Sequence, residues 1–230
     1  MATAIAEPAG AASGDAMYRP GPSVKHYAVF KADRPEGDRI AELRRVVSAA
    51  SNQTWTVETY RREIRSSGPR AEELIRTDRL VRAGDGVRLV ESLNHERRKK
   101  SVFLDGGLRM VPALIEPMNT YGNEVTVEIF DLDREGNDTG KLAERGTVER
   151  FVEFTGFDVI TTPAGEYNAA RIETTTVYEL GRANVRFVHT EWVEDNLGIV
   201  GSSVADTILV LGLPFSQTDE LRLLMDAPTP

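Results

Sequence analysis

The feature that most constrains this chain is a succession of short segments with strand chemistry, beginning at Val24. The segments are rich in Val, Ile, Thr, Tyr and Phe, and Gly, Pro, Asn and Asp stand between them, as turns require. Strands without long helical connections pair antiparallel, because parallel neighbours need a crossover of a dozen residues or more. We therefore predict an all-β, mainly antiparallel fold with little helix. The expected strands are Val24–Lys31, Thr54–Ile64, Gly86–Leu93, Leu108–Ile115, Glu124–Phe130, Thr147–Phe154, Phe157–Thr161, Tyr167–Leu180, Val185–Val193, Gly198–Ile208 and Glu220–Met225.

The segment from Asp38 to Ala50 fits two kinds of element. It contains good helix formers, and Asp38 could cap a helix. It also runs through three turn-forming residues into the strand-like sequence TWTVETY, and we interpret it as the first arm of a hairpin, with a short helix as the alternative. Because no repeat or linker interrupts the chain, we expect one β domain over residues 23–230, after a flexible Ala/Gly/Ser-rich segment of residues 1–22.

Composition excludes several classes of function. The chain has 230 residues, of which 40% are hydrophobic, so it can bury a core. It has no Cys, which excludes disulfides, thiol nucleophiles and Cys-ligated zinc. A net charge of -8 argues against nucleic acid as a partner. No apolar run is long enough to span a bilayer, and the first residues lack the basic and apolar regions of an export signal, as in a tether or a chain whose signal was removed.

Three fragments in fixed order carry a family resemblance: YRPGPSVKHYAVF, FDVITTPAGEYNAARIETT and TEWVEDNLGIVGSS. Together they resemble a group of exported bacterial proteins of unknown function, with a strand, a Pro-Ala-Gly turn, a long strand and a Trp-containing strand that ends in Gly-Ile-Val. The resemblance implies a single curved sheet or open half-barrel similar to bacterial lipoprotein carriers. It also implies a periplasmic or extracellular location at the cell envelope, and no shared catalytic residues. Independently, Pro163, Ala164 and Gly165 predict a tight turn, since Pro presets φ and Gly adopts conformations that other residues avoid.

Two charged segments are candidate ion sites. In DLDREGNDTG, the opening of a calcium loop is matched by Asp131, Asp133, Glu135 and Gly136. Leu142 stands where the bidentate Glu is required. We interpret this segment as an exposed acidic hairpin turn. The run HERRKK, from His95 to Lys100, could meet phosphates or an anionic surface, but it has no interleaved aromatic residue, and we interpret it as a solvated turn.

The remaining candidates lie on strands. His189 and Glu191 share one face of VRFVHTEW and could act as an acid and base pair or hold a metal with further ligands, but a cross-strand polar contact is the commoner role. No hydrolase, zinc-protease or nucleotide-binding motif is present, and we assign no catalytic residues, metal or cofactor. Four large aromatic residues either pack in the core or line a ligand cavity of the curved sheet: Trp55, Tyr60, Tyr178 and Trp192.

Three hypotheses follow. The first is a non-enzymatic envelope protein that binds a lipid, another apolar small molecule or a segment of an envelope partner through these aromatic residues. The second is a structural or assembly module that acts through its surface and edge strands. The third is a hydrolase-type enzyme with scattered carboxylates, for which Glu191 and His189 would have to converge in a cleft.

Overall fold

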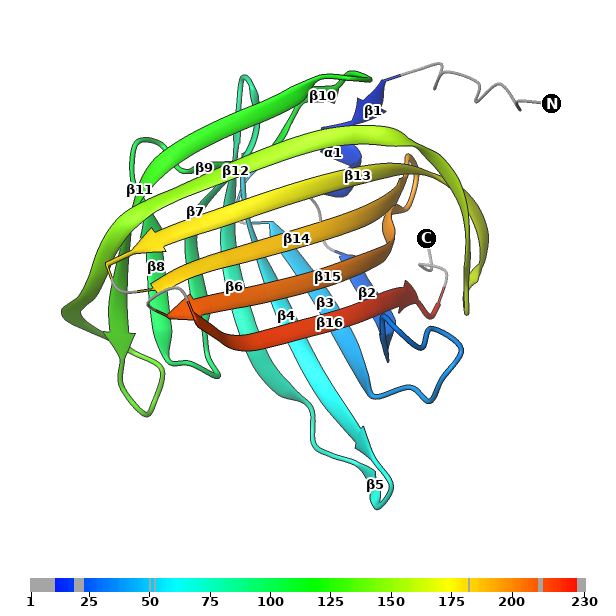
Figure 1. Ribbon diagram of the computed structural model, residues 1–230, viewed down its shortest axis with the longest axis horizontal. Helices are drawn as coiled ribbons and strands as arrows, with labels where there is room; N and C mark the ends of the chain where they lie inside the picture. The colour runs from blue at the N-terminus through cyan, green and yellow to red at the C-terminus, as the bar shows by residue number, and fades with distance from the viewer. Residues whose placement is uncertain are drawn as a thin grey trace.

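The structure is a computed structural model that describes residues 11–18, 23–49, 51, 53–181, 183–210 and 213–226. Nearly all of these residues lie in β-strands (Figure 1). The elements are β1 Ala12–Ser13, α1 Gly14–Met17, β2 Ser23–Lys31, β3 Ala41–Ala49, β4 Thr54–Arg65, β5 Gly68–Pro69, β6 Glu73–Ala83, β7 Gly86–Asn94, β8 Lys99–Phe103, β9 Leu108–Pro112, β10 Leu114–Ile115, β11 Thr120–Leu132, β12 Asp138–Thr162, β13 Gly165–Leu180, β14 Ala183–Glu194, β15 Gly198–Val210 and β16 Leu213–Leu224.

Twelve of the described strands form a closed antiparallel barrel. The order around it is β2, β3, β4, β6, β7, β8, β11, β12, β13, β14, β15 and β16, and β16 then pairs with β2. The all-β prediction with little helix is confirmed, but the prediction of a single curved sheet or open half-barrel is wrong. The last strand, β16, pairs with β2, the first strand of the barrel, from Glu220 opposite Lys31 to Leu224 opposite Tyr27. Closure satisfies backbone groups that a half-barrel would leave unpaired at two edges.

Local sequence explains several elements. The segment from Asp38 to Ala50 contains β3, which pairs with β2 and β4, so the hairpin interpretation is confirmed and the helix alternative is wrong. The Pro-Ala-Gly segment is a tight turn, as predicted, with Thr162 opposite Gly165. Gly165 has a φ of 140°, a backbone conformation that residues with a side chain rarely adopt.

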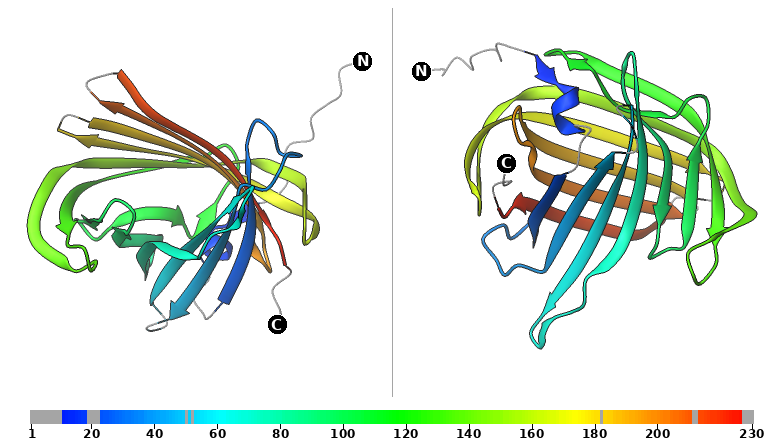
Figure 2. Two further views of the ribbon diagram at one scale, coloured as in Figure 1. Left: turned by 90° about the horizontal axis from the view of Figure 1, so that it is seen from below. Right: turned by 180° about the vertical axis from the view of Figure 1, so that it is seen from behind.

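A short N-terminal segment, β1 and α1 together with Tyr18, lies inside one end of the barrel. The contacts of α1 run to β14 and β15 on one side and to β7 and β9 on the other, so it crosses between opposite walls (Figure 2). Ala12, Ala16, Met17 and Tyr18 are buried. The sequence placed these residues in the flexible segment of residues 1–22, of which 1–10 and 19–22 lie outside the described residues. The division into that segment and one β domain stays a prediction.

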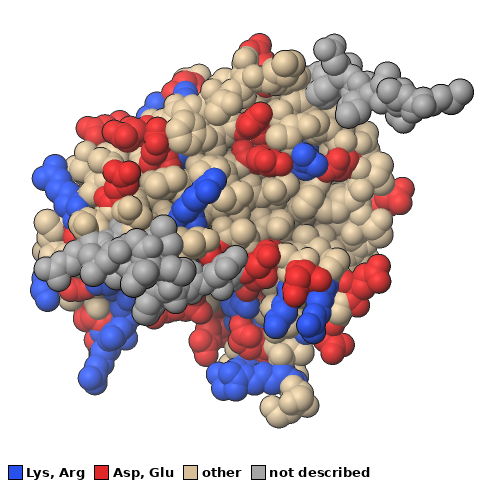
Figure 3. Space-filling model, viewed as in Figure 1, with Lys and Arg blue, Asp and Glu red and all other residues tan. Residues whose placement is uncertain are grey.

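The apolar core fills the same end of the barrel as the N-terminal segment. Trp55 near the start of β4 lies opposite Leu80 near the end of β6, which lies opposite Leu89 on β7. These side chains and Leu224 near the end of β16 are almost completely buried. The outer surface is polar in many places: on the face shown in Figure 3, acidic and basic side chains alternate over its lower part.

Candidate functional site

The inner surface of the barrel carries many polar and charged side chains. Strand alternation in a closed barrel sends every second side chain inward, and the burial pattern of β13 shows which ones. Ile172, Thr174 and Thr176 on β13 are buried, whereas the residues between them are more exposed. The registers extend this inner surface across the neighbouring strands. Its buried polar residues include Arg150, Thr174, Thr176, Glu191, Ser202 and Glu220.

Some of the inner charges are paired with each other. Glu220 forms ion pairs with two arginines: its Oε1 lies 2.9 Å from Arg61 Nη1, and its Oε2 lies 3.0 Å from Arg222 Nη2. Arg76 Nε lies 2.8 Å from Asp78 Oδ1, and the negative charge of Asp78 raises the pKa of the Arg76 guanidinium. These pairs compensate for the cost of placing charges inside the barrel.

Arg150, also on the inner surface, is held by neutral groups. Its Nη1 donates to Thr176 Oγ1 at 2.8 Å, and its Nε donates to the Met110 carbonyl at 3.0 Å. These two contacts fix the direction of the guanidinium toward the β9 and Thr176 side of the lumen. Arg150 therefore has defined acceptors that do not include a neighbouring carboxylate.

Five buried polar atoms in the described part of the chain have no hydrogen-bond partner: Trp55 Nε1, Thr174 Oγ1, His189 Nε2, Glu191 Oε2 and Asp206 Oδ1. Four of them lie on three adjacent strands, β13, β14 and β15. Thr174 is directly opposite His189, and Glu191 follows two residues later on the same face of β14. His189 Nε2 lies 3.7 Å from Asp206 Oδ1, too far for a hydrogen bond. We call Thr174, His189, Glu191 and Asp206 the β13–β15 polar cluster.

Aromatic rings border the β13–β15 polar cluster. Phe187 lies edge-on between Tyr178, at 5.7 Å between ring centroids, and His189, at 6.2 Å. In the N-terminal segment, burial and then the negative charge of Glu191 raise the pKa of the Tyr18 hydroxyl to about 12. Burial likewise raises the pKa of Tyr27 to about 12, and its hydroxyl donates to the Ile199 carbonyl at 3.0 Å. The cluster thus combines unpaired polar atoms with apolar ring faces.

The four aromatic residues predicted from the sequence do not form one site. Trp55 and Tyr178 are on the inner surface, and burial raises the pKa of the Tyr178 hydroxyl. Tyr60 and Trp192 are on the outer surface, where Trp192 Nε1 donates to Asp158 at 3.1 Å. The strand registers place Trp55 and Tyr178 on the other side of the barrel wall from Tyr60 and Trp192. A binding role for the four residues stays a prediction.

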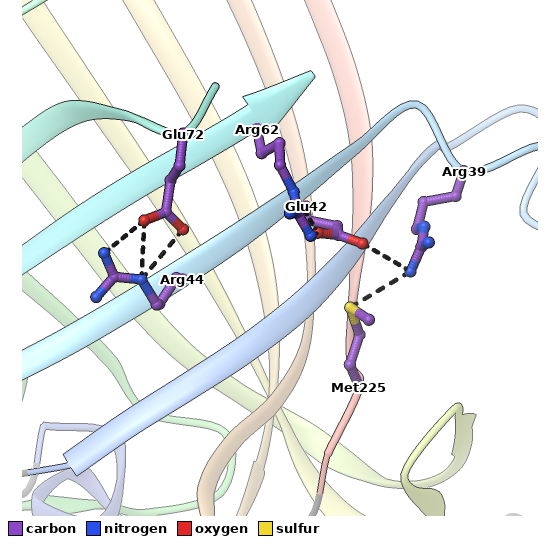
Figure 4. Close-up of polar contacts among 6 residues, drawn as sticks. All are labelled: Arg39, Glu42, Arg44, Arg62, Glu72 and Met225. Carbon is purple, nitrogen blue, oxygen red and sulfur yellow. Dashed lines mark hydrogen bonds and ion pairs between the residues drawn. The ribbon is translucent and has the colours of Figure 1, made fainter. Parts of the chain in front are cut away.

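The surroundings of Tyr60 are those of an ordinary outer surface. The Arg44 guanidinium lies 4.0 Å from the Tyr60 ring centroid. Arg44 also binds Glu72, and the neighbouring Glu42 pairs with Arg39 and Arg62 (Figure 4). Exposed ion pairs of this kind contribute little to stability, and they have no ligand-binding geometry.

The two charged segments predicted as turns lie side by side. The acidic segment forms the β11–β12 hairpin turn, and the basic run covers the β7–β8 turn and the start of β8, as predicted. Lys99 pairs with Asp131, and Lys100 Nζ lies 3.0 Å from Asp138 Oδ2. Asp131 is thus paired with a lysine, and Asp133 accepts hydrogen bonds from Asn137. In the described residues, no group of three His, Cys, Asp or Glu side chains could hold a metal ion.

Sequence reasoning found half of the β13–β15 polar cluster. Alternation correctly placed His189 and Glu191 on one face, but it gave no sign of which face points inward. It missed Thr174 and Asp206, because their nearness to His189 depends on the pairing of β13 and β15 with β14. The sequence of β13 gave no clear signal for Thr174, because it belongs to a run of three threonines from Thr174 to Thr176.

Comparison with models of protein families and with curated proteins finds no match. Three solved structures are similar over most of the chain. A candidate lipoprotein from Parabacteroides distasonis has a TM-score of 0.48 and 14% identity, over 92% of this chain and 97% of that chain. A candidate exported protein with a YmcC-like fold from Bacteroides fragilis has a TM-score of 0.45 and 12% identity, over 92% of this chain and 97% of that chain. The hypothetical lipoprotein YmcC from Escherichia coli has a TM-score of 0.40 and 10% identity, over 95% of this chain and 90% of that chain.

With TM-scores below 0.5 and identities of 14% or less, these likenesses decide neither the fold nor the function of this chain. The described part of the chain contains no helix with the length and apolar character needed to cross a membrane.

Proposed function

We propose that this chain is a non-enzymatic binding protein of the cell-envelope type, which holds a small molecule inside its barrel against the β13–β15 polar cluster. The observation that carries the proposal is the set of unpaired polar atoms on one stretch of the inner surface. The envelope location rests on the sequence resemblance to exported bacterial proteins.

Buried polar atoms without partners are rare in native proteins, because each costs about 1–3 kcal/mol, and more when charged. One such atom is a local accident, but four on adjacent strands point to a partner outside the chain. Glu191 and Thr174 are 8% and 2% exposed, so bulk water does not supply that partner freely. A bound molecule with polar groups would supply the missing hydrogen-bond partners.

Two side chains of the cluster are partly exposed. The side chains of His189 and Asp206 point inward, yet each is 27% exposed, so space the size of water adjoins them. Barrels of about eight strands are just filled by their side chains or hold one small ligand, and wider ones enclose larger spaces. A twelve-stranded barrel, apolar at one end and polar beyond it, suits a ligand that has both an apolar part and a polar group.

The two other hypotheses receive less support. A closed ring leaves few free strand edges in the described part of the chain, which weakens an assembly role through edge strands. A hydrolase would need a nucleophile hydrogen-bonded to a base that a third group orients. Thr174, His189 and Asp206 have the right chemistry, but no hydrogen bond joins Thr174 Oγ1 to His189, and His189 Nε2 and Asp206 Oδ1 are 3.7 Å apart.

Native mass spectrometry of the protein purified from its own host tests the proposal, with solvent extraction of anything that it retains. We expect a stoichiometric small molecule that is lost on unfolding. A mass equal to that of the bare chain, together with no mass shift on incubation with lipid and metabolite extracts, would contradict the proposal and favour an assembly role.

A further inference from the structure

We propose that the β13–β15 polar cluster is a site for a protonated primary amine that carries an apolar chain. This inference rests on the proposed binding function and names the chemical class of the ligand.

The unpaired atoms of the cluster call for a hydrogen-bond donor. An ionised carboxylate only accepts hydrogen bonds, and Glu191 Oε2 and Asp206 Oδ1 both lack a donor. Thr174 Oγ1 can accept as well as donate, and so can neutral His189 through one ring nitrogen. Of the five unpaired atoms, Trp55 Nε1 alone can only donate, and it belongs to β4, away from the cluster. An anionic ligand would therefore meet few free donors here.

The strand register gathers the acceptors around one part of the lumen. Thr174 lies opposite His189, and Ile172 lies opposite Glu191, so Thr174 and Glu191 are diagonal neighbours across β13 and β14. Diagonal neighbours in a sheet are about 7–8 Å apart at their Cα atoms, close enough for both side chains to contact one bound group. A primary ammonium has three N–H donors, which match Glu191 Oε2, Thr174 Oγ1 and His189 Nε2.

Among the described residues, no arginine on the inner surface donates a hydrogen bond to Glu191 Oε2 or Asp206 Oδ1. Arg76 is paired with Asp78. Arg150 is bound to Thr176 and to the Met110 carbonyl, and Thr176 is four residues along β13 from Ile172, a distance of about 13 Å at ~3.3 Å per residue.

Other positive groups also lie on the inner surface, among them Arg61, which is paired with Glu220. The Arg45 guanidinium lies 5.4 Å from the ring centroid of Tyr18, and Arg222 is paired with Glu220. Glu191 is 8% exposed with an oxygen that has no hydrogen-bond partner, so an incoming ammonium would supply the missing donor through a charge-assisted hydrogen bond.

The rings beside the cluster suit the rest of such a ligand. Phe187 and Tyr178 present apolar surface next to His189, and aromatic faces also attract ammonium groups. An amine with a short alkyl chain would place its charged end on Glu191 and its chain along these rings.

Isothermal titration calorimetry of the full chain with n-hexylammonium tests the inference. Three ligands of similar size serve for comparison. 1-Hexanol has no charge, hexanoate has a negative charge, and hexyltrimethylammonium keeps the positive charge but has no N–H donors. The test variants are Glu191→Gln and Thr174→Val, and the matched controls on the outer surface of β13 are Glu173→Gln and Thr175→Val. Thermal melts of each variant confirm that it is folded.

We expect hexylammonium to bind at least tenfold more tightly than the three comparison ligands. Glu191→Gln should weaken binding about tenfold or more and Thr174→Val several-fold, whereas both outer-surface controls should leave Kd unchanged. Equal binding of hexanol or hexanoate, with no effect of Glu191→Gln, would overturn the amine site but leave binding in the lumen intact. Absence of binding by hexylammonium at millimolar concentration would also overturn it, and native mass spectrometry would then decide the proposed function separately.

Discussion

Glu191 should destabilise the ligand-free protein. Its Oε2 atom is buried without a partner, and a buried unsatisfied charged acceptor costs at least 1–3 kcal/mol. Glu191→Gln removes the charge, keeps the shape and recovers part of that cost, so we expect it to raise the free energy of unfolding by about 1–2 kcal/mol. For a domain of this size, such a change raises Tm by about 2–8 °C.

Chemical denaturation of ligand-free wild type and Glu191→Gln, followed by far-UV circular dichroism, measures the change. The matched control is Glu173→Gln on the outer surface, where Glu173 pairs with Arg171 at 3.4 Å and is largely exposed; it should change stability by less than about 0.5 kcal/mol. A loss of 1 kcal/mol or more in Glu191→Gln, with a neutral control, would refute the reasoning, since it would mean that Glu191 has a stabilising partner within the chain.

Three further predictions concern the frame around the cluster. Gly198 has a φ of 75°, and a Cβ atom there would lie 2.6 Å from the Ala16 carbonyl oxygen. Gly198→Ala should therefore lower the free energy of unfolding by about 2 kcal/mol and speed hydrogen exchange in residues 12–18. Gly84→Ala, at a position with open space around it, should do neither. Because folding raises the pKa of Tyr18 to about 12, the folded state holds the hydroxyl proton more tightly than the unfolded state. The free energy of unfolding should therefore fall as pH rises from 10 toward 12. Tyr18→Phe should reduce this dependence on pH in alkaline denaturation curves. Glu220→Gln removes a carboxylate that pairs with two partly buried guanidinium groups, of which Arg61 keeps Glu63 as a partner. The change should lower the free energy of unfolding by about 1–3 kcal/mol in urea titrations. An unchanged value would mean that the ion pairs are absent in solution.

The strands could be predicted from the sequence because their signals are local. Alternation and β-branched residues marked β13 and β14, and Pro163 with Gly165 marked the turn before β13. Closure of the barrel could not be predicted, since the pairing of Leu224 with Tyr27 joins the two ends of the chain and leaves no trace in either segment alone. The packing of residues 12–18 was missed for a similar reason, because small residues such as Ala12 and Ala16 are typical of flexible segments and also fit a narrow barrel end.

The candidate site shows the same division. His189 and Glu191 were recognised together because they belong to one strand, and the large aromatic residues were recognised by type. Which aromatic residues face inward depends on strand register, and this separated Tyr60 and Trp192 from Trp55 and Tyr178. A polar lumen could not be foreseen while the sheet was expected to be open.

A crystal structure of the protein from its own host, at a resolution that shows bound molecules and water, tests the central claim most directly. The account predicts density for a bound molecule in the lumen, with a polar group within hydrogen-bond distance of Glu191 Oε2 and Thr174 Oγ1. A lumen filled by side chains, with Glu191, His189 and Asp206 hydrogen-bonded to other residues of the chain, would contradict it.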